Sequence, residues 1–376
     1  MQNQKLLDIL QLINTDGVGP VTFYNYLKRA GNTEDALQMA AQKRALFPRD
    51  MAELELEKAQ KNGISIITYE DKLYPKNLLE LNDAPPILYA LGRIDLLSFP
   101  LSVSIVGARN ASIAGRKTAS RIAYDLTEND VLVVSGMARG IDGAAHKGAL
   151  YAKAQKGTTI AILGTGIDVP YPTENTELYY NIRDNGLLLS ELALGTNAQI
   201  ANFPRRNRLI AALTEGTLVV EAGINSGSLI TAKLALEQGK EIFAVPGSPL
   251  ESRSAGPNRL IKEGALLTEN AEDILNTLSM RQNRILKPQK TLQLPLDKPK
   301  NQVNISAQQE ILKIQPQTAE KNTNLLDLIS HEGVDIDELL RSCGLPQSEF
   351  FAEILDLEFS GKIERHAGNK VAKIKG

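Results

Sequence analysis

Short apolar runs alternate with helical stretches from about residue 64 to residue 275, and this alternation most constrains the fold. Runs such as "SVSIVG", "VLVVSG" and "TIAILG" are rich in valine, isoleucine and leucine with almost no polar interruption. Such runs indicate strands buried on both faces, which is typical of a parallel sheet covered by helices on each side. The sequence therefore predicts an α/β fold, a doubly wound Rossmann-like parallel sheet. We expect its strands in "ISIITY", "PILYAL", "SVSIVG", "VLVVSG", "TIAILG", "LLLSE", "TLVVEA", "EIFAVPG" and "ALLT".

The segments on either side of this region have a different character. Residues 1–62 form a predicted small helical domain of the helix-hairpin-helix or SAM-like kind, and the Rossmann-like domain spans 63–280. Within the helical domain, the loop "TDGVGP" precedes an amphipathic stretch. Its glycine turn either exposes backbone amides that take up a phosphate or is simply a tight connection between helices.

Residues 281–320 are rich in glutamine and proline and predict a linker, because they cannot bury enough apolar area to fold. Residues 321–376 then predict three helices and a short hairpin, the pattern of a winged-helix domain. The third helix would lie in the recognition position, yet it carries only carboxylates, which repel a phosphate backbone. A protein contact or a regulatory dock is therefore favoured over DNA reading for this module; the acidic residues are Glu349, Glu353, Asp356 and Glu358.

Composition excludes several classes of function. Lys and Arg number 42 against 44 Asp and Glu, so nucleic-acid binding would need a local basic patch. A single cysteine, Cys343, gives no disulfide framework, and three dispersed histidines give no metal-ligand spacing. Neither a secretory signal nor an apolar run long enough to span a membrane is present, and we expect a cytoplasmic protein.

The sequence predicts neither a cofactor nor a catalytic centre. The glycine-rich turns have the wrong spacing for a dinucleotide fingerprint, and no P-loop is present. Asp142 and His146 share a helical face, but a structural role in orienting a neighbouring turn is favoured for them, and no activated serine or cysteine accompanies them. We therefore expect a binding protein without enzymatic activity.

Small, polar and basic residues follow the predicted strands, at the edge where ligands bind in an open parallel sheet. The loops concerned hold Gly107, Ala108 and Arg109, then Ser135, Gly136 and Arg139, and then Ser226, Gly227 and Ser228. Backbone amides and guanidinium groups at such an edge can hold phosphates.

The segment "FPRRNRLIAAL" adds arginines at the start of a helix, where cations oppose the helix dipole unless an anion lies among them. An exposed phenylalanine beside guanidinium groups suits a single-stranded nucleic acid, with phosphates on arginine and a base stacked on the ring. The alternative is a phenylalanine in the core and arginines in surface ion pairs. The residues are Phe203, Pro204, Arg205, Arg206, Asn207 and Arg208.

Together these motifs resemble the family of the DNA-processing protein DprA, also called Smf. The resemblance rests on "VGARNASIAGRKTA", "SGMARGIDGAAHKGAL", "TIAILGTGIDVPYPTENTEL", "GLLLSE", "FPRRNRLIAAL", "LVVEAGINSGSLITAKLALEQGKEIFAVPGS" and "AGPNRLIKEGA", in that order. It implies a single-stranded-DNA-binding protein of natural transformation that protects incoming strands and helps load the RecA recombinase. It also implies a homodimer through the Rossmann-like domain.

The sequence departs from the family pattern at two places. The family's Gly-Ser-Arg motif falls on Gly107, Ala108 and Arg109, so Arg109 would grip phosphate while Ala108 lacks a hydroxyl that nearby amides or Ser135 must replace. The lysine often found upstream of the family's Phe-Pro-x-Arg-Asn-Arg motif is missing, and Arg205 would substitute for it. An alternative is a nucleotide-monophosphate phosphoribohydrolase of the lysine-decarboxylase-like fold, although the chain lacks that family's Pro-Gly-Gly turn.

Overall fold

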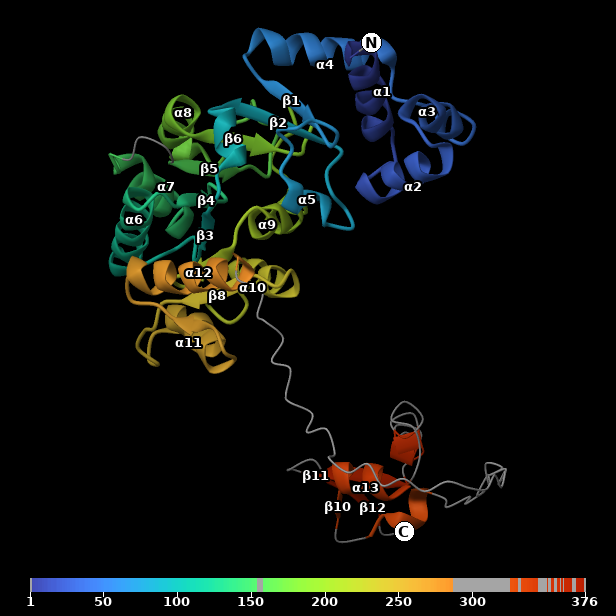
Figure 1. The fold of residues 1–376 in the computed structure, drawn as a ribbon, viewed down its shortest axis with the longest axis vertical. Coiled ribbons are helices and arrows are strands. Elements are labelled where there is room, and N and C mark those ends of the chain that lie inside the picture. Colours follow the sequence, from blue (N-terminus) through green and yellow to red (C-terminus); the bar gives the residue numbers. More distant parts are fainter. Residues whose placement is uncertain are drawn as a thin grey trace, which may run out of the picture. The chain divides into compact units, whose positions relative to one another are not determined.

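The chain divides into two compact units, Met1–Leu292 and Gln293–Gly376, which are described separately. In the computed structural model, the described residues are 2–153, 158–286, 325–330, 333–343, 350, 353–354, 357–358, 360, 362–366 and 370–374. Figure 1 shows the elements of both units.

The first unit begins with four helices, α1 (Gln2–Asn14), α2 (Pro20–Ala30), α3 (Thr33–Ala41) and α4 (Arg49–Lys61), which lie in the segment predicted to be helical. Phe23 and Leu10 are fully buried between them. The carboxylate of Glu55 on α4 accepts hydrogen bonds from the Tyr89 hydroxyl at 2.7 Å and the Leu194 amide at 3.1 Å. These bonds attach the helical domain to the sheet that follows.

A nine-stranded sheet forms the centre of the first unit, and its strands lie in the nine segments where the sequence predicts them. The bounds are β1 (Ser65–Thr68), β2 (Ile87–Gly92), β3 (Ser102–Val106), β4 (Leu132–Ser135), β5 (Thr159–Ile162), β6 (Leu187–Ser190), β7 (Gly216–Val219), β8 (Glu241–Ala244) and β9 (Leu266–Leu267). Their order is β1-β2-β6-β5-β4-β3-β7-β8-β9, and the strands from β6 to β9 are parallel. The predicted Rossmann-like fold is confirmed.

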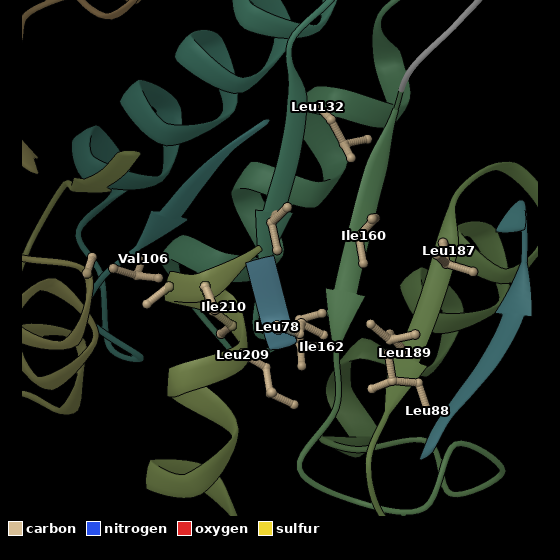
Figure 2. Packing of buried hydrophobic residues seen from close by; sticks show 14 of the residues in the cluster. Leu78, Leu88, Val106, Leu132, Ile160, Ile162, Leu187, Leu189, Leu209 and Ile210 are labelled. Carbon is tan, nitrogen blue, oxygen red and sulfur yellow. The ribbon is translucent and has the colours of Figure 1, made fainter. Parts of the chain in front are cut away.

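Helices cover both faces of this sheet (Figure 1). Side chains alternate between the faces along each strand: Val133 packs in the cluster that contains α6 and α7, and Val134 in the cluster that contains α9 and α10. Figure 2 shows Leu209 and Ile210 of α9 in the second cluster, near Leu78 of α5. The helices are α5 (Lys76–Leu79), α6 (Ile113–Glu128), α7 (Ile141–Tyr151), α8 (Thr176–Asn185), α9 (Asn202–Ala212), α10 (Gly227–Glu237), α11 (Ala255–Lys262) and α12 (Ala271–Leu286).

Helix α12 continues to Leu286 and so crosses the expected domain limit at 280. The rest of the expected linker, residues 287–320, lies outside the described residues. Among the helices that the structure describes, none has the length and apolar character needed to cross a bilayer.

The second unit contains a three-stranded antiparallel sheet in the order β10-β12-β11. Leu339 and Phe350 are buried in its small apolar core. Of the acidic residues expected on the third helix, Glu353 and Glu358 are helical, and Glu349 and Asp356 lie outside the described residues. The elements are η4 (Leu325–Leu328), β10 (Val334–Asp335), α13 (Ile336–Cys343), β11 (Ile363–His366) and β12 (Lys370–Lys373).

Candidate nucleic-acid interface

The candidate site lies where the strand order of the sheet reverses. Strands β4, β5 and β6 follow one another on one side of β3, and β7 lies next to β3 on the other side. Ligands of open parallel sheets bind at this point, beyond the carboxyl ends of the strands. The two loops that leave β3 and β7 are joined by a hydrogen bond from the Ala108 amide to the Glu221 carbonyl oxygen at 2.6 Å.

The N-terminus of α6, which directly follows the β3 loop, is occupied by the carboxylate of Glu221. This carboxylate accepts hydrogen bonds from the Ser112 amide at 2.9 Å and from the Ser112 hydroxyl at 2.5 Å. A Cβ at Gly115 would lie within 2.7 Å of the Glu221 carboxylate, so only glycine allows the approach. The phosphate position of a dinucleotide site is therefore filled by a side chain of the protein itself.

Arg109 and Phe203 meet above the sheet edge. The guanidinium of Arg109, an exposed residue, lies 5.4 Å from the centre of the Phe203 ring. The Phe203 ring is half-buried and lies 5.4 Å from the Tyr171 ring, at an interplanar angle of 35°. A Cβ at Gly164 would lie 2.8 Å from the Phe203 ring, so a glycine is needed beneath it. A cation and two aromatic faces are thus exposed together, which combines phosphate binding with base stacking.

Two hollows adjoin this group, and Arg109, Tyr171 and Phe203 line both of them. The larger hollow, about 480 Å³, extends over the loops after β3 and β7; its other lining residues include Gly107, Ala108, Asn207, Ser226, Gly227 and Ser228. The smaller hollow, about 270 Å³, extends over the loops after β4 and β5 and includes Gly136 and Arg139.

Arg206 lies at the floor of both hollows but acts mainly as a structural residue. It is only 6% exposed, and its Nη1 donates to the carbonyl oxygens of Gly136 and Ile162, the latter at 2.6 Å. A Cβ at Gly136 would clash with the guanidinium, which explains the glycine there. Burial lowers the pKa of Arg206 to about 10, and the Asp142 carboxylate opposes this shift. Arg206 still adds positive charge beneath the hollows.

Asp142 on α7 orients a neighbouring turn as the sequence predicts, whereas His146 on the same helix contacts strand β5 and not a turn. The Asp142 carboxylate accepts from the Gly136 amide at 3.2 Å and the Ala138 amide at 3.4 Å, which fixes the loop after β4. Burial raises the pKa of Asp142, and the nearby Arg206 lowers it. His146 is fully buried with Nδ1 2.7 Å from the Thr159 hydroxyl, and burial lowers its pKa to about 3.

The structure corrects the expected role of Arg208. Its side chain is buried, with Nη2 2.5 Å from Glu191 and Nε 2.9 Å from Asp83. The Arg208 guanidinium and the Glu191 carboxylate therefore pair with each other inside the protein. Burial raises the pKa of Glu191. Arg208 therefore lines neither of the two hollows. Arg205 is exposed but lines neither hollow, so its substitution for the missing upstream lysine stays a prediction.

Ser135 also differs from its expected role. Its side chain is fully buried and its hydroxyl donates to the Ile105 carbonyl oxygen at 2.6 Å, because the residue is the last of β4 and points into the sheet. The amide of Ala108 is likewise engaged, with Glu221. Neither group can therefore replace the hydroxyl that Ala108 lacks.

The remaining candidate residues that line the hollows form hydrogen bonds or ion pairs within the protein. Asn207 is buried and donates to the Gly227 carbonyl oxygen at 3.3 Å, which ties α9 to the start of α10. Ser226 caps α10, and its hydroxyl lies 2.8 Å from that of Ser228. Arg139 forms an exposed ion pair with Glu174 at 3.1 Å beside the smaller hollow.

Sequence reasoning missed Tyr171 and the role of Glu221. The available signal for Tyr171 was its position between Pro170 and Pro172, which fixes the backbone around an aromatic residue that is 40% exposed. Glu221 carried no local signal, since its partner Ser112 is distant in sequence. In the described part of the chain, no three His, Cys, Asp or Glu side chains form a group suited to a metal ion.

Comparison with known proteins decides the family. Residues 65–279 match the model of the DNA recombination-mediator protein A family, which covers more than half of the chain. The chain belongs to the DprA family. Residues 3–57 match the DprA-like N-terminal HHH domain, and residues 313–369 match the DprA winged helix domain.

Relatives and solved structures of the DprA family agree with this result. The chain is 44% identical to the DNA processing protein DprA of Streptococcus pneumoniae over 61% of this chain and 78% of the relative. It is 36% identical to Protein Smf of Escherichia coli over 88% of this chain and 83% of that protein. The structure of the S. pneumoniae protein superposes with a TM-score of 0.58 and 37% identity, covering 73% of this chain and 92% of the other.

A structure of DNA processing protein A from Helicobacter pylori, which concerns its single-stranded DNA binding mode, is also similar. It superposes with a TM-score of 0.52 and 33% identity, and the match covers 58% of this chain and 97% of the other. The family, the Rossmann-like fold and a DNA-processing class of function are therefore established for this chain.

Proposed function

We propose that this protein binds single-stranded DNA at the edge of the sheet where Arg109 and Phe203 meet. The observation that supports this most strongly is the exposed guanidinium of Arg109 over the Phe203 ring, between two hollows. A phosphate pairs with the guanidinium, and a base stacks against an aromatic face. The H. pylori relative, whose structure concerns single-stranded DNA binding, supports the same function.

The proposal includes two partners. RecA is the recombinase that the protein would help to load, which the description of the family as recombination mediators supports. A second copy of the chain would bind through the Rossmann-like domain. Strand β9 at the sheet edge supports this dimer, because Leu266 and Leu267 are 39% and 50% exposed there, and open apolar edges favour pairing.

Binding to matched oligonucleotides tests the proposal. Fluorescence anisotropy should show tighter binding of poly-dT than of a duplex of equal length, with affinity that falls as salt rises. Equal affinity for both, or none for poly-dT, would contradict the proposal. RecA filament formation on strands covered by a single-strand-binding protein should accelerate when this protein is added, and light scattering should give the mass of two chains.

The same preparation tests the phosphoribohydrolase alternative. Glu221 is the acidic residue nearest to that family's pattern, but both of its carboxylate oxygens are occupied by Ser112. We therefore expect no ribose 5-phosphate when the protein is incubated with AMP. Release above the background of a heat-treated sample would favour the hydrolase.

A further inference from the structure

A polar hollow in the N-terminal helical domain is separate from the site described above. One face of α2 provides four of its lining residues, because positions 22, 25, 26 and 29 follow the spacing of neighbouring helical turns. Lys43, just beyond α3, completes it. The hollow has a volume of about 190 Å³ and is lined by Thr22, Asn25, Tyr26, Arg29 and Lys43.

Every side chain that lines this hollow carries a hydrogen-bond donor, and none is a carboxylate. Arg29 and Lys43 are both exposed, and neither forms an ion pair with the described residues. Other cations of the domain are engaged, since Lys5 pairs with Glu70 and Arg49 with Asp8. Two unneutralised cations beside one small hollow create a positive potential that favours an anion.

Tyr26 adds a further hydrogen-bond donor to this hollow. The residue is only 8% exposed and its ring packs in the apolar core of the helical domain. It lines the hollow, and its hydroxyl has no hydrogen-bond partner among the described residues. The hydroxyl oxygen itself is accessible to solvent, so the hydroxyl can donate a hydrogen bond to an oxyanion in the hollow.

The dipole of α2 explains only part of this arrangement. Arg29 and Lys28 lie in the last turn of the helix, where cations are favourable. That effect does not account for Lys43, which belongs to the segment after α3. It also does not account for the neutral donors Thr22 and Asn25 on the side of α2 that faces the hollow.

We propose that this hollow binds a phosphate group, and that the phosphate belongs to a strand of DNA. The assignment to DNA rests on the function proposed above, whereas the phosphate chemistry rests on the lining residues alone. The helical domain would then provide a second phosphate contact to the strand, within the same compact unit as Arg109.

A paired charge substitution tests the proposal on the full-length chain. Arg29→Gln with Lys43→Gln removes both cations, and Lys58→Gln with Lys61→Gln is the matched control, because these two lysines lie exposed in the last turn of α4. On long poly-dT, the first pair should reduce the slope of log affinity against log salt by about 0.7, since the hollow holds one phosphate and each single-strand phosphate contact contributes about 0.7. The control pair should leave the slope unchanged. Tyr26→Phe should weaken binding roughly two- to tenfold.

The outcomes separate this inference from the proposed function. Both double variants could show the same salt dependence of poly-dT binding as the unmodified protein, while Arg109→Ala still weakens binding. The proposal of a second phosphate site would then be wrong, and the proposed function would stand. Calorimetry with inorganic phosphate at low salt distinguishes the source of the phosphate. The assignment to DNA would be overturned by two results together. The Arg29→Gln with Lys43→Gln variant, and not the control variant, would lose the heat of phosphate binding, and its salt dependence of poly-dT binding would equal that of the unmodified protein. An unmodified protein that does not bind poly-dT would overturn both proposals.

Discussion

The guanidinium carbon of Arg109 lies 5.4 Å from the centre of the Phe203 ring. The two residues come from different elements, the loop after β3 and the first turn of α9. Neither alone forms a site for a polynucleotide, because phosphate binding needs the charge and base stacking needs the ring. Their separate substitution should therefore have different effects on DNA binding.

Arg109→Ala should weaken binding of all single-stranded sequences alike. The loss of one charge-assisted phosphate contact should cost roughly 1 to 3 kcal/mol and reduce the salt slope by about 0.7. Anisotropy with poly-dT and a mixed-sequence strand at several salt concentrations measures both quantities. Arg121→Ala is the control, because Arg121 is an exposed arginine on α6 paired with Asp125. Equal affinities of the two variants would remove Arg109 from the interface.

Phe203→Ala should remove a stacking surface without removing charge. We expect a loss of about 1 to 3 kcal/mol in binding and an unchanged salt slope. Because the ring is half-buried against Tyr171, Phe203→Leu is the companion variant that keeps apolar volume. Binding by Phe203→Leu that equals the unmodified protein, in a folded sample by circular dichroism, would show that the ring only packs.

The buried ion pair of Arg208 with Glu191 should matter for stability and not for DNA contact. Glu191→Ala leaves Arg208 buried with only the partly exposed Asp83 as partner, which should cost roughly 3 to 5 kcal/mol of stability. The urea midpoint measures this loss. Glu237→Ala, which breaks an exposed pair with Lys233, should change stability by about 0 to 1 kcal/mol. A similar midpoint for both variants would contradict this assignment.

The sequence predicts the strands well and the burial of charges poorly, for physical reasons. A strand buried on both faces, such as Ser102–Val106, needs consecutive apolar residues, and that pattern is local. Whether the Arg208 side chain is buried or exposed depends instead on Asp83 and Glu191, which are distant in sequence and lie beside it only in the folded chain. Three arginines in one short segment therefore look alike in sequence and differ in the structure.

The candidate site was predictable to the extent that it follows from topology. Arg109 follows a strand at the point where strand order reverses, so its position at the sheet edge could be expected. Ser135 also follows from an apolar run, but it is the last residue of β4 and its hydroxyl bonds within the sheet. A shift of one residue at a strand end decides between interior and surface, and sequence patterns do not resolve such boundaries.

His146 should make stability depend on pH. Its pKa falls from 6.5 to about 3 because the imidazole is buried, so the unfolded chain binds a proton that the folded chain excludes between these values. Stability from the neutral form is complete above pH 6.5 and is lost as the pH falls toward 3, by roughly 5 kcal/mol over the whole window. Asp142 and Glu191 act in the opposite direction, since burial raises their pKa values.

Comparison with His146→Gln isolates this histidine, because the contributions of Asp142 and Glu191 are common to both proteins. The free energy of unfolding, measured by urea at several pH values from 7 to 4, should fall more steeply for the unmodified protein. The reason is that glutamine takes up no proton when the chain unfolds. The buried Nε2 of His146 has no hydrogen-bond partner among the described residues. Parallel curves for the two proteins would show that the imidazole nevertheless takes up a proton in the folded state, because water reaches it or because the proton finds a partner.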